Sequence, residues 1–491
     1  MDERAAFRLK REPRLESKHA AFPYQTEAAS FVASRTFSAI FHEQGLGKTK
    51  IAIDVMLQWL ASKAVDVVLV ITKKSLVANW AREFAAHSYL RPMILGEDGR
   101  RNLQALTGAG RLVLGHYEVV LKEEQRLRAW LGMRRVGVIL DESAKIKNPD
   151  AALSRALHRI APLFEKRVIM TGTPVANRPF DVWSQIYFLD QGASLGTDFV
   201  AFKADHDFHK KYVDDQPAFD RYQQRLASVA DRLKTISVRE RKDGGRIALP
   251  NKEFVRVPVS WEPEQYEMYR QVREDLRLVV QKEGELVRED QEPVLKRLLR
   301  LVQIASNPRL VDEAYTGTPG KLSVLQDLVR DIVRGEEKVI IWTSFTDNAE
   351  WLASQFADLG ANALHGQLSM ERRNSVIAWF IENRDDRVLV ATPGAAKEGL
   401  TLTVANHAIF FDRTYSLDDY LQAQDRIHRV SQTKTCFVYN LVMQDSVDEW
   451  IETLIDEKRL AAQLTQGDID VRAYAERATL SFFEVLKAIL H

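Results

Sequence analysis

The sequence predicts an α/β protein with two doubly wound parallel-sheet lobes and helical protrusions between them. Two observations support this fold class. Short apolar runs rich in Val, Ile and Leu alternate with amphipathic helical patterns in the first 190 residues and again after residue 320. Such runs suit parallel strands that are buried on both faces, and their alternation with helices is typical of doubly wound sheets. Residues 191–320 instead carry long, highly charged helical patterns.

The apolar runs place the strand candidates in chain order. A run of apolar and small residues at 37–41 leads into a helical pattern at 49–61. The other candidates are 66–72, 112–115, 136–140 and 167–170 in the first lobe, and 338–342, 361–364, 387–391, 407–411 and 436–442 in the second. The region between has an extended segment at 253–259 and two helical patterns, 217–235 and 263–306; the first begins with a proline, which a helix tolerates there.

These patterns divide the chain into five parts. A basic lead-in covers residues 1–21, the first lobe covers 22–190, and the helical protrusions with the inter-lobe linker cover 191–320. The second lobe covers 321–470, and a C-terminal helix covers 471–491, with the clearest amphipathic pattern at 473–491. The length of 491 residues agrees with two or three domains.

Composition narrows the classes of function. With 45% hydrophobic and 28% charged residues, the chain is typical of a soluble globular protein with a sizeable core. It has no apolar run of about 18 residues, and its charged N-terminus lacks the apolar centre of a signal peptide. The one cysteine, Cys436, excludes intrachain disulfides and cysteine-rich zinc modules, and we expect a buried, inert thiol. With a net charge of +1, a nucleic-acid partner would need local basic patches.

Residues 42–49, HEQGLGKT, follow the first apolar run and end in the pattern of a phosphate-binding P-loop. In that pattern, glycines such as Gly45 and Gly47 let backbone N–H groups approach phosphates, Lys48 reaches the β and γ oxygens, and Thr49 holds magnesium. The helix at 49–61 would direct its positive N-terminal end at the same anion. His42 replaces the first glycine of the general pattern, and a glycine turn with a chance Gly-Lys-Thr is the alternative interpretation.

A pair of carboxylates, Asp141 and Glu142, follows the strand candidate at 136–140. In P-loop enzymes such a pair completes the site, with Asp141 holding magnesium and Glu142 polarising the attacking water. The alternative is a solvent-exposed Asp-Glu at a strand end. Because the carboxyl ends of parallel strands share one edge of a sheet, we expect the pair near the P-loop. Residues 171–174, TGTP, follow the next strand candidate and could link this site to a neighbouring surface.

Gln422, Arg426 and Arg429 lie on a predicted helix of the second lobe, with the arginines three residues apart and on one face. Two arginines presented together could stabilise the charge that develops on a transferred phosphoryl group, provided that the lobes pack together. The alternative is a solvated basic helix face.

Two further clusters carry weaker signals. Tyr24 and Gln25 precede the P-loop and offer a ring and an amide to an adenine base, although Tyr24 could equally be a core residue. His206 and His209 are three residues apart with no third ligand nearby, so we expect exposed helix residues and no metal site.

The order of these motifs resembles helicase superfamily two, and within it the Swi/Snf-type DNA translocases, over residues 22–443. The stretches that carry the resemblance are PYQTEAASFV, EQGLGKT, KSLVANWAREF, DESAKIKNPDA, TGTPVANRPFDVWSQIYFLD and LVQIASNPRLV, followed by KVIIWTSFTDNAEWL, LHGQLSMERR, EGLTLTVANHAIFFDRTYS and QAQDRIHRVSQTK. The stretch that contains Asn177 and Trp183 is the most distinctive of them. The family tolerates a residue other than glycine where His42 stands.

The resemblance implies two RecA-like lobes that bind ATP and Mg²⁺ in a cleft, with double-stranded DNA across both. The implied nucleotide-binding residues are Gln25, Gly45, Leu46, Gly47, Lys48, Thr49, Lys50, Asp141, Gly399 and Gln422, of which Thr49 and Asp141 hold the metal. The implied catalytic residues are Lys48, Glu142, Arg426 and Arg429. DNA contacts are expected at Lys73, Lys74, Ser75, Trp80, Lys145, Lys147, Trp342, Thr343, Gly366 and Arg372. Any one of the lysines, or Arg372, could instead be an ordinary solvated side chain.

The chain departs from the family pattern at three places. The fourth position of the acidic box is Ala144, where the family commonly has a histidine or glutamine that helps to couple hydrolysis to DNA binding. The paired glycines usual before Gly399 are absent, and Ser431 replaces a glycine. Because every catalytic residue is present, we expect an active ATPase.

The leading hypothesis is an ATP-driven translocase on double-stranded DNA that displaces proteins or remodels branched DNA. One alternative is a helicase that separates DNA or RNA strands, and the other is a nucleotide-switched DNA-binding scaffold with little turnover, which Ala144 suggests. We expect a monomer with no membrane partner, which a separate protein could direct to its substrate. Its compactness suggests a bacterial or phage protein of the cytoplasm and nucleoid, or a nuclear protein if the source is eukaryotic.

Overall fold

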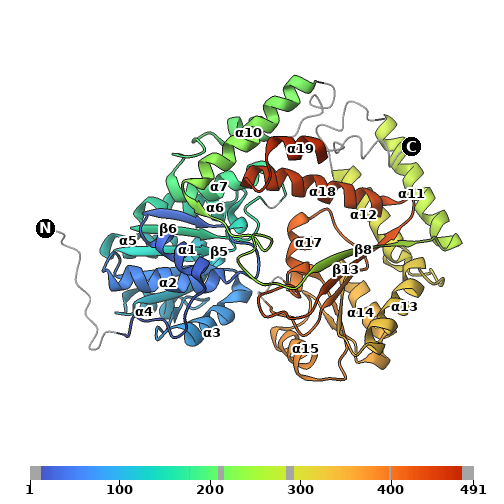
Figure 1. The fold of residues 1–491 in the computed structure, drawn as a ribbon, viewed down its shortest axis with the longest axis horizontal. Helices are drawn as coiled ribbons and strands as arrows, with labels where there is room; N and C mark the ends of the chain where they lie inside the picture. The colour runs from blue at the N-terminus through green and yellow to red at the C-terminus, as the bar shows by residue number, and fades with distance from the viewer. Residues whose placement is uncertain (1–12, 176, 208–214, 283–291, 397–399, 478–491) are drawn as a thin grey trace. The chain divides into compact units, whose positions relative to one another are not determined.

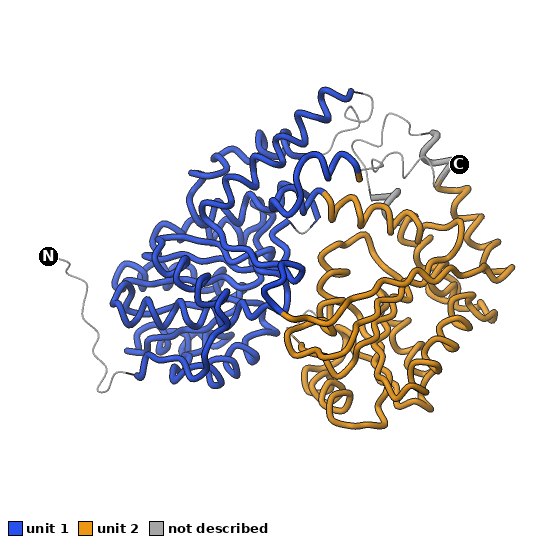
Figure 2. The backbone as a smooth tube through the Cα atoms, viewed as in Figure 1, with its two compact units in different colours: residues 1–247, 461–476 blue, residues 248–460, 477–491 orange. Residues whose placement is uncertain are grey.

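The computed structural model describes residues 13–175, 177–207, 215–282, 292–396 and 400–477 (Figure 1). The chain divides into two compact units, which Figure 2 shows in two colours. Unit 1 comprises Met1–Ile247 and Ala461–Glu476, and unit 2 comprises Ala248–Leu460 and Arg477–His491. Each unit contains one parallel sheet flanked by helices, which confirms the predicted fold class of two α/β lobes.

Among its described residues, unit 1 has a seven-stranded sheet. The strands are β1 (Phe37–Ile40), β2 (Val67–Thr72), β3 (Met93–Ile94), β4 (Leu112–His116), β5 (Val136–Asp141), β6 (Lys166–Met170) and β7 (Ser237–Val238). The helices are α1 (Pro23–Ala33), α2 (Lys48–Ala61), α3 (Val77–His87), α4 (Gly99–Thr107), α5 (Tyr117–Met133), α6 (Ala152–Ile160), α7 (Trp183–Asp190), α8 (Phe199–His206), α10 (Gln216–Lys234) and, late in the chain, α19 (Val471–Arg477). Short 3-10 turns are η1 (Lys74–Leu76), η2 (Ser143–Ile146), η3 (Ala161–Leu163) and η4 (Pro179–Val182).

The strand order in unit 1 is β3-β4-β2-β5-β6-β1-β7, and every neighbouring pair is parallel. Side chains alternate between the two faces of a strand, so Val68 and Val70 of β2 join one apolar core with Trp59 of α2. Leu69 and Ile71 of the same strand are equally buried, although they point to the other face. The near-continuous apolar runs therefore mark strands that are covered on both faces.

Among its described residues, unit 2 has a six-stranded sheet. The strands are β8 (Lys252–Val259), β9 (Val339–Trp342), β10 (Asn362–Leu364), β11 (Val388–Ala391), β12 (His407–Phe410) and β13 (Cys436–Met443). The helices and 3-10 turns are α11 (Pro263–Lys282), α12 (Glu292–Ser306), η6 (Pro308–Leu310), α13 (Gly320–Arg334), α14 (Thr346–Gln355), η7 (Ala357–Leu359), α15 (Met370–Glu382), α16 (Pro393–Ala396) and α17 (Leu417–Gln424). Helix α18 (Val447–Gln466) begins in unit 2 and ends in unit 1.

The sheet of unit 2 has the order β10-β11-β9-β12-β13-β8, again with every pair parallel. Position by position, it matches β3-β4-β2-β5-β6-β1 of unit 1, so the two sheets share one topology. Strand β8 corresponds to β1, the strand before the P-loop, and pairs with β13 along its whole length.

The strand predictions are confirmed, and their ends differ from the observed ends by one residue. The sequence does not predict β3 and β7, because a strand of two residues has no periodic signal. The extended segment at 253–259 is β8, which belongs to the sheet of unit 2 and not to a protrusion.

The helical region at 191–320 is divided between the two units after residue 247. The pattern at 217–235 is α10, and the pattern at 263–306 contains α11 and α12, whose described parts are separated by residues 283–291. The predicted C-terminal helix at 471–491 begins as α19, and residues 478–491 lie outside the described residues.

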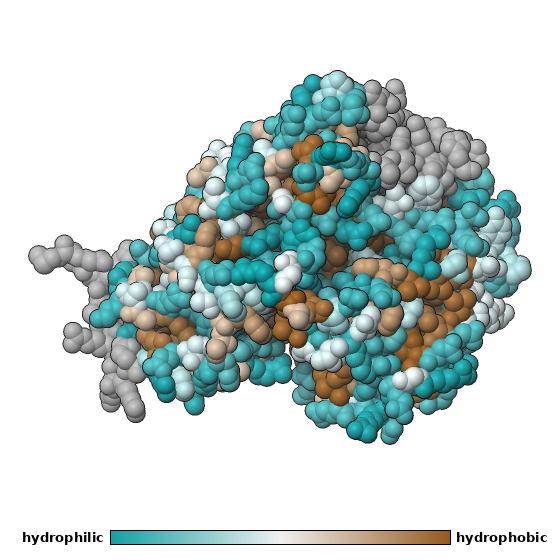
Figure 3. All heavy atoms as spheres, in the orientation of Figure 1, coloured by the Kyte–Doolittle hydropathy of each residue, from teal (hydrophilic) through white to brown (hydrophobic). Residues whose placement is uncertain are grey.

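The surface agrees with the composition. Hydrophilic residues cover most of the face drawn in Figure 3, and hydrophobic residues interrupt them in separate groups. Within the described parts of the chain, we find no helix with the length and apolar character needed to cross a membrane.

Candidate functional site

The P-loop joins β1 to α2 in a conformation that suits phosphate binding. Gly45 and Gly47 have φ angles of 85° and 73°, in the left-handed region that favours glycine. Gly47 precedes α2, and a β-carbon at this position would lie 2.3 Å from Nε2 of Gln25. The first backbone N–H groups of a helix have no partner within the helix, so the loop presents them to an anion.

Lys48 is the first residue of α2, and its side chain is nearly buried against the loop. Its Nζ donates to the carbonyl of His42 at 2.9 Å and to the carbonyl of Glu43 at 3.2 Å. These bonds hold the ammonium group against the backbone that, in a P-loop, surrounds the β and γ phosphates.

Tyr24 and Gln25 of α1 hold the loop at another point. The Tyr24 hydroxyl donates to the carbonyl of Leu46 at 3.0 Å, and Nε2 of Gln25 donates to the same carbonyl at 3.3 Å. Oε1 of Gln25 accepts from the backbone N–H of Phe22 at 3.0 Å. Tyr24 is therefore a buried residue that supports the loop, and the contact between Gln25 and adenine stays a prediction.

Two residues predicted to bind the nucleotide have side chains that are engaged elsewhere. Leu46 is fully buried, and the ammonium group of Lys50 forms a buried ion pair with Asp54 on α2. Their backbone groups can still face a phosphate, so the nucleotide contacts of Leu46 and Lys50 stay predictions.

His42 occupies the first position of the P-loop and is buried beside Tyr24, with their ring centroids 6.0 Å apart. Burial is the main cause that lowers the pKa of His42 to about 3, and the positive charges of Lys48, Arg239 and Arg246 add to it. The imidazole is therefore neutral at physiological pH. A neutral ring thus fills the position where the general pattern has glycine.

Asp141 ends β5 and is the centre of a buried hydrogen-bond network. Its Oδ2 accepts from the Thr72 hydroxyl at 3.0 Å and from Nε1 of Trp80 at 2.8 Å. Burial and the charge of Glu142 raise the pKa of Asp141 to about 6, while those hydrogen bonds and the charge of Lys48 oppose this rise. Since Lys48 is near enough to act on Asp141, the P-loop and the acidic pair belong to one site.

Glu142 follows with its backbone in the left-handed region, at a φ of 52°. Residues other than glycine seldom adopt positive φ, and those that do are concentrated at functional sites. Its carboxylate lies 4.0 Å from Nζ of Lys73. Because Asp141 and Glu142 are both buried, the alternative of a solvent-exposed Asp-Glu pair is wrong.

The residue types at the end of the P-loop and the end of β5 fit a magnesium ion. Mg²⁺ prefers oxygen ligands and takes one or two from the protein, with phosphate oxygens and water completing its shell. Asp141 offers a carboxylate and Thr49 a hydroxyl, whereas the described residues contain no cluster of three or more His, Cys, Asp or Glu that would form an all-protein metal site. A cation beside Asp141 would also favour the ionised carboxylate, which burial disfavours.

The predicted arginine pair lies in unit 2, but not on a helix. Helix α17 ends at Gln424, and Arg426 and Arg429 lie in the turns that follow, so the prediction of a shared helix face is wrong. Nη1 of Arg426 donates to the carbonyl of Leu400 at 3.4 Å, and Nη1 of Arg429 donates to the hydroxyl of Thr401 at 2.8 Å. The two arginines are thus brought together through one segment that starts at residue 400.

Two further residues are predicted to bind the nucleotide. Gln422 lies on α17, and Gly399 directly precedes the segment that starts at residue 400. Gln422 is buried, and its amide donates to the carboxylate of Asp418 at 2.7 Å. Gly399 lies outside the described residues. The roles of both residues stay predictions.

The four lysines predicted to contact DNA in unit 1 lie at one edge of the sheet. Two follow β2 and two follow β5, which are neighbouring parallel strands. Each forms an ion pair: Lys73 with Glu142 at 4.0 Å, Lys74 with Glu97 at 2.8 Å, Lys145 with Glu118 at 3.3 Å and Lys147 with Asp181 at 3.6 Å. The Lys74–Glu97 and Lys145–Glu118 pairs are exposed, and pairs of this kind contribute about 0–1 kcal/mol, so a DNA phosphate could replace the carboxylate at little cost. Glu142 and Asp181, the partners of Lys73 and Lys147, are buried. Ser75, also predicted, is half-buried beside them.

Three residues predicted to contact DNA have buried side chains, and their contacts with DNA stay predictions. Trp80 is 1% exposed and donates to Asp141, and Trp342 is 0% exposed in β9. Thr343 is also fully buried and donates to the carboxylate of Asp412 at 2.6 Å. By contrast, Gly366 and Arg372 of unit 2 are exposed, as a DNA contact requires.

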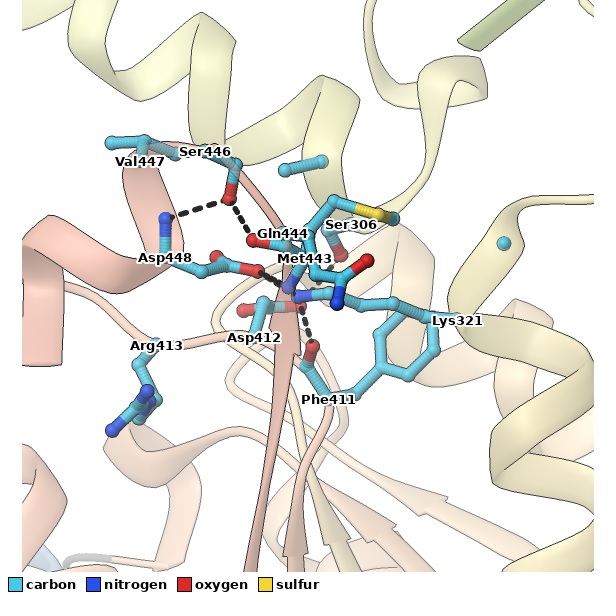
Figure 4. A network of polar contacts seen from close by, with 12 residues as sticks. Ser306, Lys321, Phe411, Asp412, Arg413, Met443, Gln444, Ser446, Val447 and Asp448 are labelled. Atoms are coloured by element: carbon cyan, nitrogen blue, oxygen red, sulfur yellow. Dashed lines mark hydrogen bonds and ion pairs between the residues drawn. The ribbon is translucent and has the colours of Figure 1, made fainter. Parts of the chain in front are cut away.

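Asp412 follows β12 and organises unit 2 (Figure 4), and no prediction from the sequence singles it out. Its carboxylate accepts from the hydroxyls of Ser306 and Thr343 and from the backbone N–H of Ser344, at 2.6–2.8 Å. The available signal is an aspartate directly after an apolar strand, the same pattern that marks Asp141.

Lys321 is a second residue that the sequence analysis does not single out. It is fully buried and forms an ion pair of 2.6 Å with Asp448, and its Nζ also donates to the carbonyl of Phe411 at 2.8 Å (Figure 4). A Gly-Lys pair before an amphipathic helix is the signal that sequence offers.

Two other predictions can be compared with the structure. His206 is buried and its Nδ1 lies 2.8 Å from the carbonyl of Phe202, so the prediction of an exposed side chain is wrong for it. His209 lies outside the described residues. Cys436 is buried as predicted.

Two family models match the chain. The SNF2-related domain matches residues 24–310, which include the P-loop, the acidic pair and the four lysines. The chain belongs to the SNF2-related family. The helicase conserved C-terminal domain matches residues 320–431 of this SNF2-related protein, a range that contains Asp412, Arg426 and Arg429.

Known SNF2-related and helicase proteins are similar along most of this chain. An uncharacterized ATP-dependent helicase of Mycoplasma pneumoniae is 25% identical over 451 residues, which are 89% of this chain and 41% of the relative. The ISWI chromatin-remodeling complex ATPase ISW1 of Saccharomyces cerevisiae is 26% identical over 471 residues, 90% of this chain and 40% of the relative. The chain therefore spans less than half the length of these relatives. The solved Sulfolobus solfataricus SWI2/SNF2 ATPase core in complex with dsDNA is 25% identical, with 96% and 97% of the two chains covered and a TM-score of 0.43.

Proposed function

We propose that this SNF2-related chain hydrolyses ATP and uses the energy to move along double-stranded DNA, where it remodels protein–DNA complexes or branched DNA. The observation that carries the proposal is the site in unit 1 that combines Lys48 of the P-loop with Asp141 and Glu142. Membership of the family and the names of the relatives, an ATP-dependent helicase and a chromatin-remodeling ATPase, support ATP and DNA as the ligands.

In the proposed reaction, the loop N–H groups and Lys48 bind the β and γ phosphates. Asp141 and Thr49 are the proposed holders of Mg²⁺, which neutralises charge on those phosphates when it is bound. Glu142 orients the attacking water, because its carboxylate directly follows the metal-binding residue. Arg426 and Arg429 remain the proposed groups that stabilise the transferred phosphoryl.

The ion pair between Lys73 and Glu142 offers a route from DNA to hydrolysis. Lys73 belongs to the row of lysines proposed to bind DNA phosphates, and Glu142 is the proposed catalytic carboxylate. A phosphate that attracts Lys73 would remove a positive charge from the vicinity of Glu142 and release the carboxylate for water. Ala144 lies close by in η2, and its methyl group has no hydrogen-bonding atom that could carry such a signal.

Steady-state ATP hydrolysis without DNA and with duplex, single-stranded, forked and RNA ligands tests the proposal. Duplex DNA should raise the rate, and Glu142→Gln should lower it about 100-fold or more while nucleotide binding persists. A rate that does not respond to DNA would rule out a DNA-driven motor. Displacement of a triplex-forming strand without unwinding supports translocation, and unwinding of a labelled duplex supports a helicase instead.

Lys73→Ala and Lys74→Ala form a matched pair for the coupling step, because both lysines are adjacent but only Lys73 faces Glu142. Lys73→Ala should raise the rate without DNA and reduce stimulation by DNA. Lys74→Ala should weaken DNA binding and reduce the slope of log binding constant against log salt concentration by about 1. The rate of ATP hydrolysis without DNA should not change. Equal effects of the two variants would contradict the coupling role of Lys73.

A further inference from the structure

Helix α18 leaves unit 2 and carries the chain back to unit 1. Its residues up to Leu460 belong to unit 2, and residues 461–476, which we call the return segment, belong to unit 1. At its start in unit 2, Asp448 forms the buried ion pair with Lys321 (Figure 4). A second aspartate, Asp468, follows its end in unit 1.

The end of α18 places Asp468 at a defined position. Gly467 has a φ of 74°. The backbone N–H of Asp468 donates to the carbonyl of Gln463 at 2.8 Å, and the backbone N–H of Gly467 donates to the carbonyl of Leu464 at 3.1 Å. This is the glycine C-cap of a helix, which turns the chain sharply. A β-carbon on Gly467 would lie 3.2–3.3 Å from side-chain atoms of α10, so the turn packs closely against that helix.

Asp468 then forms a two-point ion pair with Arg239, which directly follows β7. Nε and Nη2 of Arg239 donate to the two carboxylate oxygens at 2.6 Å and 2.5 Å. The Asp468 and Arg239 side chains are 6% and 17% exposed. Arg241 donates in addition to the backbone carbonyl of Asp468 at 3.0 Å. A shielded, two-point contact between guanidinium and carboxylate fixes orientation as well as distance.

The same arginine reaches the residue before the P-loop. Nη1 of Arg239 donates to the carbonyl of Phe41 at 2.8 Å, and the N–H of Phe41 donates to the carbonyl of Val238 at 2.8 Å. His42 follows Phe41, and its carbonyl accepts from Nζ of Lys48. Contacts therefore run without interruption from Asp468 through Arg239 and the backbone at 41–42 to the phosphate-binding lysine.

We propose that Asp468 and Arg239 form a latch through which the return segment positions the P-loop for nucleotide. Both are positioning residues, since neither is placed to touch the phosphates. The consequence for nucleotide rests on the proposed ATPase function, whereas the effect on the loop backbone does not. The return segment has a second contact with unit 1 that does not involve Asp468 or Arg239. The ring centroid of Tyr474 lies 6.2 Å from that of Phe219 on α10. Breaking the latch should therefore loosen the loop without detaching the segment.

Hydrogen exchange on the full chain without nucleotide tests the latch directly. Asp468→Asn should accelerate exchange of backbone N–H groups at residues 40–49 by about tenfold, because the constraint on Phe41 is lost. The matched control is Asp470→Asn, which removes the same charge two residues later. Asp470 caps α19 through the N–H of Ala473, a bond that asparagine retains. Unchanged exchange at 40–49 in Asp468→Asn, or equal acceleration in the control, would overturn the latch.

Nucleotide binding and hydrolysis then separate the latch from the proposed function. Asp468→Asn should weaken binding of a fluorescent ATP analogue and raise KM for ATP about tenfold, with a smaller change in kcat. Arg239→Lys should do the same, and Asp468→Glu should restore part of the affinity. Faster loop exchange with unaltered nucleotide affinity would show that the latch does not position the P-loop. If the wild-type chain binds no ATP analogue, the proposed function fails, and the exchange experiment still decides whether the latch exists.

Discussion

Two lysines that each follow a glycine, Lys48 in unit 1 and Lys321 in unit 2, have different surroundings. Lys48 is held by two backbone carbonyls of its own loop, at 2.9 Å and 3.2 Å. Lys321 is held by the carboxylate of Asp448 at 2.6 Å, with its side chain fully buried. Neutral carbonyls can be exchanged for a phosphate, whereas a buried ion pair is costly to separate. The surroundings of Lys48 therefore suit the proposed phosphate contact, whereas those of Lys321 suit a role in stabilising the fold.

The sheets of the two units share one strand order, so equivalent positions in unit 1 and unit 2 can be compared directly. Each has a threonine whose hydroxyl bonds an aspartate that ends or follows the next strand of the sheet: Thr72 with Asp141, and Thr343 with Asp412. The loops after the equivalent strands differ. Strand β1 leads into the glycine-rich P-loop, whereas β8 leads to Trp261, whose Nε1 donates to the carbonyl of Gln444 at 2.7 Å. The two units therefore share one topology and differ in the loop that follows the equivalent strand.

The largest expected effect is that of Lys48→Ala. Hydrolysis should fall by about 1000-fold or more, because the charge that stabilises the transferred phosphoryl is lost. The free energy of unfolding should fall by about 1–2 kcal/mol, because the variant loses two hydrogen bonds to loop carbonyls and a positive charge that acts on the buried Asp141. ATPase rates and urea unfolding measure the two quantities. Lost activity together with a large loss of stability would make Lys48 a structural residue like Lys321.

Lys321→Met should have the opposite profile. Removing one partner of a buried ion pair leaves Asp448 uncompensated, and the free energy of unfolding should fall by about 3–5 kcal/mol. Urea unfolding followed by circular dichroism measures this loss. The double variant Lys321→Met/Asp448→Leu should recover part of the stability, because it removes both charges. No recovery would show that the two residues act separately.

His42 should make the stability of unit 1 sensitive to acid. Its pKa is lowered from 6.5 to about 3 in the folded protein, so stability is complete above pH 6.5 and is lost as the pH falls toward 3. This linkage corresponds to a loss of about 2 kcal/mol between pH 8 and pH 5. Unfolding at both pH values should show that His42→Asn removes this part of the pH dependence. The equivalent position of unit 2 has Trp261, which does not titrate, so Trp261→Phe is the control.

The smallest effects are expected at the two threonines. Thr72→Val and Thr343→Val should each lower the free energy of unfolding by about 1 kcal/mol or slightly more, the value of one buried hydrogen bond. The hydrogen bond from Thr72 lowers the pKa of Asp141, so Thr72→Val should move the acidic limb of the pH–rate profile to higher pH. Thr343→Val should leave that limb in place. A shift in both variants would contradict the assignment of catalysis to unit 1.

Local signals in the sequence predict most of the fold and bring together the residues of the candidate nucleotide site. The strand runs, the P-loop and the acidic pair are each encoded in a few consecutive residues, and the structure places them as expected. The exposure of a particular side chain is harder to predict. Trp80 has the sequence setting of a DNA contact, but its indole bonds Asp141, which is 61 residues away. Arg426 and Arg429 have helical spacing, but the helix ends before them.

The sequence by itself therefore determined the two α/β lobes, their family and the candidate phosphate, magnesium and water-activating residues. Only the tertiary structure decided which polar side chains meet. Asp468 and Arg239 are 229 residues apart, and Thr343 and Asp412 are 69 residues apart. The physical reason is that strand and loop formation depend on neighbouring residues, whereas burial and ion pairing depend on segments that the fold brings together.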